Sequence, residues 1–263
     1  MQDFFANCAT VLQKYGFSYL RGAGTTLLLA LVGTFFGCLI GFAVGALQTI
    51  PVDKQRDPVW KRVLLKILHI FLRCYVELFR GTPMIVQAVF IYYGLLQVFG
   101  IKMGMWQAGF FIVSINTGAY MAESVRGGII SVDPGQTEGA KAIGMTHVQI
   151  MTNVILPQAF RNIIPQIGNN FIINIKDTCV LSIIGTVELF YTTKGVAGAL
   201  YTYFESFTIA MVIYFIMTFT CSRLLRLWEK KMDGADNFDL ATTDTLAYTS
   251  GMYRYPDDKK EEQ

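Results

Sequence analysis

The sequence predicts an all-α membrane protein with five transmembrane helices, and three observations lead to this prediction. The chain has 263 residues, of which 53% are hydrophobic and only 16% are charged, whereas an ordinary soluble domain carries about 25% charged residues. Apolar runs recur along the chain, and a run of about 18 apolar residues is long enough to cross a bilayer. Lysine and arginine gather in alternate segments between these runs, which is typical of a multi-pass membrane protein.

The five predicted crossings differ in quality. Residues 25–48 form a long apolar run, and residues 84–99, 106–122 and 207–221 are shorter and uncharged. Residues 167–189 qualify only if Lys176, Asp177 and Glu188 are accepted at membrane depth. The first run is too long for a signal peptide and has no cleavage site after it, so we expect it to act as its own insertion signal.

An amphipathic helix is predicted between the first two crossings, over residues 60–81. Its charged side chains recur every three or four residues, which places them on one helical stripe; they are Arg62, Lys66, His69, Arg73, Glu77 and Arg80. The helix lies at the inner interface or forms the lower part of a long second crossing. Gly81 ends it, and we expect Thr82 to cap the next helix with Pro83 in its first position.

Glycines recur every fourth residue in the first crossing, at Gly33, Gly37, Gly41 and Gly45. Small residues at this spacing allow two helix backbones to approach closely. We interpret this stripe as a helix-packing surface.

The basic residues set the predicted orientation. Most lysines and arginines fall in the segments after the first, third and fifth crossings, and the positive-inside rule places these segments in the cytoplasm. The N-terminus is therefore expected outside and the C-terminus inside. From residue 232 onward the chain carries eight acidic residues against three basic ones, which is typical of a disordered, solvated tail.

Residues 133–165 interrupt the apolar pattern with a polar pair of helices. Asp133 and Pro134 predict a helix start, and Gly144 predicts its end in a left-handed turn. Thr146 and Gln149 form a capping box for a second helix, which we expect to end near Leu156–Pro157. This segment is too short and polar to span, and it suits the presentation of a bend to a soluble partner.

Several motifs, taken in order, resemble the permease subunits of ATP-binding-cassette importers in the polar amino acid (histidine/glutamine/arginine-type) branch. The family's cytoplasmic EAA loop has the form E-A-A-x-x-x-G followed by I-x-L-P. Here Glu138-Gly139-Ala140, Gly144 and residues 155–157 match it, with Gly139 in place of the usual alanine. The branch-specific matches are FRGTP at 79–83 with Gln87, AY at 119–120 with Glu123, RGGI at 126–129, PQAFR at 157–161, KDT at 176–178, and IG at 184–185 ahead of EL at 188–189. The resemblance covers residues 22–228.

The resemblance implies that the EAA loop couples the membrane part to a cytoplasmic ATPase. The residues implied in this coupling are Glu138, Gly139, Ala140, Gly144, Pro157 and Arg161. The resemblance also implies two other partners for the chain: a second permease copy or homologous permease, and an extracytoplasmic amino-acid-binding protein. It further implies that the chain lies in a prokaryotic inner membrane. The chain has no G-x-x-x-x-G-K-[ST] motif, so we expect it to bind no cofactor and to be no enzyme itself, with ATP and Mg on the partner ATPase.

We therefore expect three regions. Residues 1–22 form an extracytoplasmic N-terminal segment, residues 23–231 form the transmembrane permease domain with the coupling loop at about 133–165, and residues 232–263 form the acidic tail.

Ionisable and amide side chains inside the crossings are the candidate substrate contacts, because such groups are costly at membrane depth. Lys176 and Asp177, near the middle of the fourth crossing, are expected to meet the carboxylate and amino groups of an amino acid, or to be neutralised by a neighbouring helix. Gln87, Asn116 and Asn170 either complete this pocket or join helices. The expected gate or structural contacts are Arg80, Glu123, Arg126 and Glu188, the last near the outer mouth, where a binding protein would dock.

Two other classes of protein remain open at this stage. A self-sufficient channel or ion-coupled transporter would need no partner and predicts internal inverted repeats, and no convincing repeat occurs in the sequence. A membrane-bound enzyme would need a cluster of catalytic or metal-binding groups, but the chain has only two histidines, and its five cysteines have no paired spacing. The amino acid carried and the pairing of the permease with itself or a homologue are not predicted.

Overall fold

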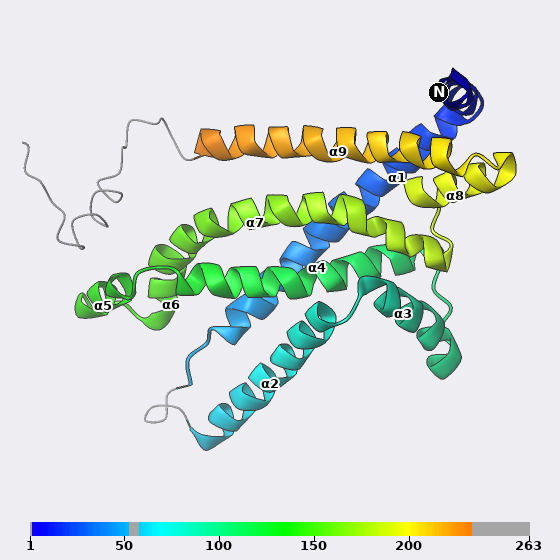
Figure 1. Ribbon diagram of the computed structural model, residues 1–263. Helices are drawn as coiled ribbons and strands as arrows, with labels where there is room; N and C mark the ends of the chain where they lie inside the picture. The colour runs from blue at the N-terminus through cyan, green and yellow to red at the C-terminus, as the bar shows by residue number, and fades with distance from the viewer. Residues whose placement is uncertain (1, 53–57, 233–263) are drawn as a thin grey trace, which may run out of the picture. The chain divides into compact units, whose positions relative to one another are not determined.

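The computed structural model describes residues 2–52 and 58–232, and its regular elements in these ranges are all helices (Figure 1). In chain order they are α1 (Gln2–Gln48), α2 (Val59–Gly81), α3 (Met84–Phe99), α4 (Met105–Ile130), α5 (Pro134–Ala142), α6 (His147–Ile150), the π-helical η1 (Met151–Ile155), α7 (Leu156–Asp177), the 3₁₀-helical η2 (Thr178–Ile184), α8 (Leu189–Leu200) and α9 (Tyr203–Met232). The chain divides into two compact units, Met1–Leu225 and Arg226–Gln263. Of the second unit, only the end of α9 is described. The predicted acidic tail lies outside the described residues except for Met232.

Two helices of the described part, α1 and α9, are long and apolar enough to cross a membrane. The pair α2 and α3 also qualifies together, although it bends by 114° at residues 81–83. The crossings predicted in α4 and α7 do not meet this criterion. Glycine, serine, threonine and asparagine lower the hydropathy of α4, a helix that packs against α1, α2, α3 and α7. The total of five crossings stays a prediction.

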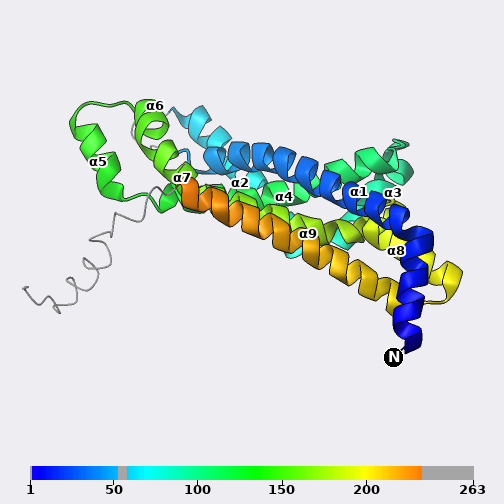
Figure 2. The same ribbon diagram turned by 90° about the horizontal axis from the view of Figure 1, so that it is seen from above.

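Helix α4 is the centre of the first unit, with α1, α2, α3 and α7 packed against it (Figures 1 and 2). Its contact with α1 is the most extensive in the described chain. The glycine stripe of α1 makes this contact possible: a Cβ atom on any of its four members would lie under 3.0 Å from atoms of Val113, Thr117, Met121 or Val125. The interpretation of this stripe as a packing surface is confirmed.

Buried polar side chains join three helices at the middle of this unit. The amide nitrogen of Asn174 in α7 donates to the hydroxyls of Thr34 in α1, at 2.8 Å, and Thr117 in α4, at 3.0 Å. All three side chains are buried. Interhelical hydrogen bonds of this kind fix the register of helices that share an apolar interface.

The prediction that Thr82 caps α3 with Pro83 in its first position is wrong. Pro83 occupies the cap position with an extended backbone, and the Thr82 hydroxyl instead donates back to the Leu78 carbonyl at 2.8 Å. The carbonyl groups left free by the bend are satisfied by Gln87, whose amide nitrogen donates to the Phe79 and Thr82 oxygens. A buried side chain one turn into α3 therefore replaces the expected local cap.

The start of the polar helix pair is as predicted. Asp133 accepts from the Gly135 N–H at 2.7 Å and Pro134 opens α5. Gly144 adopts φ +81° after it, and the bonds from Gly144 N to Lys141 O and from Met145 N to Ala140 O form a Schellman motif. The capping box of Thr146 and Gln149 is also present.

The end predicted for the second helix, near Leu156–Pro157, is wrong. The chain stays helical from His147 through η1 and α7 to Asp177. The wider π-helical turn before Pro157, closed by Leu156 N and Met151 O, gives the ring room against the preceding carbonyls.

The prediction that Lys176 and Asp177 lie near the middle of a continuous fourth crossing differs from the structure. They are the last two residues of α7, and the chain continues in the tighter η2 and then turns at Gly185, which has φ +86°. The predicted boundary between residues 22 and 23 corresponds to no break in α1.

Candidate functional site

The segment of residues 133–165 combines an anchored base with an exposed tip. Ala140, Ile150, Ile155 and Ala159 are buried and pack with residues at the end of α4. Glu138, Gly139, Gly144, Pro157 and Arg161 are exposed. The predicted coupling residues are therefore held on a fixed frame, with the exception of Ala140, which anchors the frame itself.

Two exposed apolar side chains at the tip were missed in the sequence. Ile143 is 79% exposed and Val148 is 68% exposed, on either side of the turn at Gly144. Exposed apolar groups next to charged ones are typical of a protein-binding surface. The sequence signal for them was two apolar residues within four positions of the predicted cap glycine, in an otherwise polar segment.

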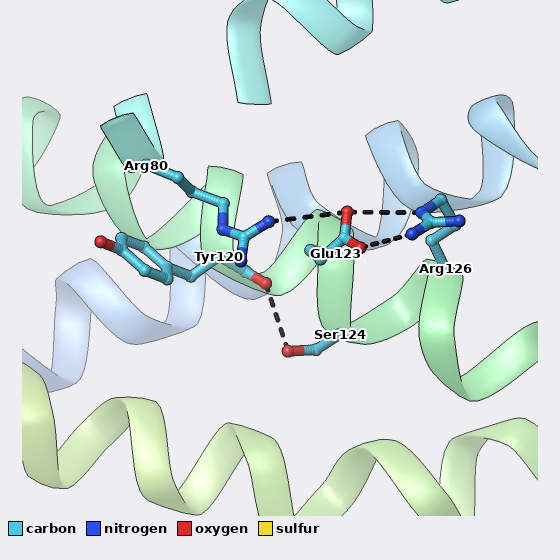
Figure 3. A network of polar contacts seen from close by, with 5 residues as sticks. All are labelled: Arg80, Tyr120, Glu123, Ser124 and Arg126. Atoms are coloured by element: carbon cyan, nitrogen blue, oxygen red, sulfur yellow. Dashed lines mark hydrogen bonds and ion pairs between the residues drawn. The ribbon is translucent and has the colours of Figure 1, made fainter. Parts of the chain in front are cut away.

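An ion-pair network crosses from α2 to α4 (Figure 3). The Glu123 carboxylate forms a two-point contact with the Arg126 guanidinium, in which Nε donates to Oε2 at 3.3 Å and Nη2 to Oε1. A second guanidinium, that of Arg80, approaches Oε2 of the same carboxylate at 3.7 Å and lies over the Tyr120 ring. The predicted local pair of Glu123 and Arg126 is therefore present, and Arg80 joins it from another helix.

The network and the 133–165 segment share a groove of about 520 Å³. Arg126 lines it from α4, and Thr137, Glu138 and Lys141 line it from α5. The groove therefore places side chains of α5 close to Arg126, one member of the ion-pair network.

The five tentative substrate residues do not gather in one place. Gln87 and Asn116 are buried and bonded to each other, with Asn116 Nδ2 donating to Gln87 Oε1 at 2.8 Å. Asn170 donates to the Gln166 carbonyl and to Met121 Sδ. Lys176 and Asp177 are exposed, and neither forms an ion pair or side-chain hydrogen bond with the described residues. The contacts of Gln87 and Asn116 match the alternative of interhelical bonding.

Glu188 is fully buried and caps α8. Its carboxylate accepts the N–H groups of Phe190 at 2.8 Å and Tyr191 at 2.6 Å, and the Tyr214 hydroxyl at 3.1 Å. A carboxylate enclosed by these donors is not presented to a docking protein, so its contacts here are structural.

No group of three or more histidine, cysteine or acidic side chains in the described ranges is placed to hold a metal ion. All five cysteines are free.

Together, the helices that are apolar enough to span, the central α4 and the exposed helix–glycine–helix segment describe a membrane-embedded subunit with a polar segment at its surface. Residues 60–234 match the family described as the inner membrane component of binding-protein-dependent transport systems. The chain belongs to this family, as the resemblance in the sequence indicated.

Relatives and a solved structure extend along most of the chain. The glutamine transport system permease protein GlnP of Escherichia coli is 32% identical over 214 residues, covering 81% of this chain and 92% of its own length. The arginine transport system permease protein ArtQ of Bacillus subtilis is 30% identical over 217 residues, covering 82% of this chain and 93% of its own length. The crystal structure of an amino acid ABC transporter with histidines contains a chain that is 37% identical, with a TM-score of 0.74, covering 84% of this chain and 96% of its own.

Proposed function

We propose that this chain is the transmembrane permease subunit of an ATP-driven importer that carries a polar amino acid across the cell membrane. The observation that carries the proposal is its likeness, over more than four fifths of its length, to permeases named for glutamine and arginine and to a chain of an amino acid ABC transporter. Because the two named relatives carry different amino acids, likeness alone does not choose the substrate.

The 133–165 segment is the proposed contact with a separate cytoplasmic ATPase, which binds ATP and Mg. Three features support this role: the exposed charges of Glu138 and Arg161, the exposed Ile143 and Val148, and the buried base that fixes them. A partner that moves this segment would act on Arg126 through the shared groove. The sequence contains no G-x-x-x-x-G-K-[ST] motif, and we propose that the partner supplies the energy.

The proposed topology has five crossings, with the N-terminus outside and the C-terminus in the cytoplasm. α1, the bent α2–α3 pair, α4, α7 and α9 are the crossings, and the distribution of basic residues supports the orientation. A second permease copy or homologue and an extracytoplasmic binding protein complete the proposed assembly.

Affinity purification followed by uptake in proteoliposomes tests the proposal. We expect the tagged chain to bring down an ATPase with a Walker motif, and labelled glutamine, glutamate, citrulline or arginine to enter the vesicles only with ATP and the binding protein. Uptake by the chain alone, without ATPase, would instead identify the self-sufficient channel or ion-coupled transporter.

A charge reversal at Glu138 tests the ATPase contact. We expect Glu138→Lys to abolish ATP-dependent uptake and weaken ATPase association while the chain still inserts in the membrane, because the side chain is exposed and forms no ion pair with the described residues. Lys102→Glu, a reversal outside the 133–165 segment, is the control. Full coupling in the Glu138 variant would contradict the assignment.

A further inference from the structure

Helix α2 has three distinct faces. Leu65, Leu72 and Val76 are buried against the protein, and a second face exposes large apolar side chains such as Ile67 and Phe71. The third face carries the charged stripe of residues 62, 66, 69, 73, 77 and 80. Charges at membrane depth face a protein interior or a water-filled cavity, so this third face is expected to border the path of a polar solute.

A cavity of about 420 Å³ lies along this charged face, between the end of α1, α2 and α4. This volume is in the range of small-molecule sites. The charged or titratable side chains lining it are His69, Arg73, Glu77, Arg80, Glu123 and Arg126. The Tyr75 hydroxyl donates to the Ile115 carbonyl at 2.6 Å and fixes α2 against α4 beside the cavity.

Among the described residues, Arg73 and Glu77 are the two lining charges with no ion-pair or side-chain hydrogen-bond partner. They lie one helical turn apart and are exposed, yet neither forms an ion pair or side-chain hydrogen bond with the described residues. An arginine placed before a glutamate at this spacing is the less favourable order for a helical ion pair. Both groups are therefore available to a ligand that carries one charge of each sign.

We propose that Arg73 binds the α-carboxylate and Glu77 the α-ammonium group of the transported amino acid. This inference rests on the proposed function. A guanidinium is suited to two-point binding of a carboxylate, and charge-assisted hydrogen bonds are the strong ones. The pair replaces Lys176 and Asp177 in the role that the sequence suggested for them.

The remaining lining charges select the side chain of the substrate. Once Arg73 and Glu77 hold the backbone charges, Arg80, Glu123 and Arg126 stay as a linked group with one excess positive charge. A cationic side chain would meet net repulsion there. The site therefore takes amino acids with neutral or acidic polar side chains and discriminates against cationic ones.

Binding of labelled amino acids to the purified permease–ATPase complex tests this assignment. We expect Arg73→Gln and Glu77→Gln each to weaken binding of the preferred amino acid by about 10- to 100-fold, the effect of losing one hydrogen-bonded charge. Lys66→Gln removes a charge from the same stripe but outside the cavity. The complex with this variant should bind the amino acid as tightly as the wild-type complex does.

Modified ligands separate a binding role from a structural one. The methyl ester of the amino acid should bind poorly to the wild type, and Arg73→Gln should no longer distinguish ester from free acid. The N-acetyl amino acid should likewise bind poorly to the wild type, and Glu77→Gln should no longer distinguish it from the free amino acid. If a variant fails to assemble, the wild type alone still decides: undiminished binding of both modified ligands would overturn the proposal.

Citrulline and arginine test the charge selection, because they are nearly equal in shape and differ in charge. We expect citrulline to bind the wild type on the order of tenfold more tightly, the effect of one like charge at roughly 10 Å. Tighter binding of arginine would overturn the selectivity. If the complex takes up none of glutamine, glutamate, citrulline and arginine, the proposed function itself fails, and this inference fails with it. If one is taken up and both variants bind it like the wild type, only this inference fails.

Discussion

The α1–α4 contact and the 133–165 segment are both punctuated by glycine, yet the glycines serve opposite purposes. In α1, a Cβ atom at Gly33, Gly37, Gly41 or Gly45 would collide with α4, so these positions are limited by space. At Gly139 and Gly144, nothing lies within 4 Å of an added Cβ, and only Gly144 is limited by its backbone conformation, with φ +81°. The difference shows that the α1–α4 contact is a packed core, whereas the 133–165 segment has open space around its two glycines.

The largest expected effect is at Gly41. A Cβ there would lie 2.9 Å from backbone atoms of Met121 and Ala122, which cannot move aside as a flexible side chain can. We expect Gly41→Val to lower the free energy of unfolding in detergent by about 3 kcal/mol or more. Gly24→Val, on the same helix with nothing within 4 Å, is the control. Equal stability of the two variants would contradict the packing argument.

A smaller effect is expected at Gly144, where the backbone and not the space is limiting. Its φ of +81° is in the left-handed region, which costs an L-residue about 1–2 kcal/mol. Gly144→Ala should speed amide hydrogen exchange around the Schellman motif and weaken ATPase association without affecting the α1–α4 contact.

Asparagine tolerates the left-handed region better than alanine, so Gly144→Asn should recover part of the loss. Equal exchange in the alanine and asparagine variants would show that the turn does not depend on this conformation.

The smallest expected effect is at Gly139, and its sign is opposite. The residue is inside α5 with open space around it, so alanine should stabilise the helix locally by about 1 kcal/mol. Amide exchange in α5 should slow about fivefold, and uptake should be unchanged. Faster exchange in Gly139→Ala would contradict the assignment of α5 as a regular helix.

Sequence reasoning succeeded where neighbouring residues decide the structure. The caps at Asp133 and Thr146 and the turn at Gly144 depend on side chains and backbone within a few positions, and all three are present. The glycine stripe was also readable, because a four-residue spacing describes one helix face whatever the partner. The partner itself, α4, was not predicted.

Sequence reasoning failed where a distant residue competes with a local signal. Thr82 has the chemistry of an N-cap. The carbonyl oxygens at the bend instead accept hydrogen bonds from Gln87 in α3 and from Asn116 in α4. Lys176 and Asp177 stood out as membrane-depth charges, yet the helix ends with them. Glu188 is a cap enclosed by Tyr214 from α9, which no spacing along the chain reveals.

Composition and charge pattern were enough to establish a helical membrane chain and a polar, capped segment between two apolar stretches, because hydropathy and helix capping act over one or two turns. Composition and charge pattern did not predict the cavity along α2. Arg73, Glu77 and Glu123 come together only because α2 is held against α4, and whether two charges satisfy each other or await a ligand depends on the distances between helices that this packing creates.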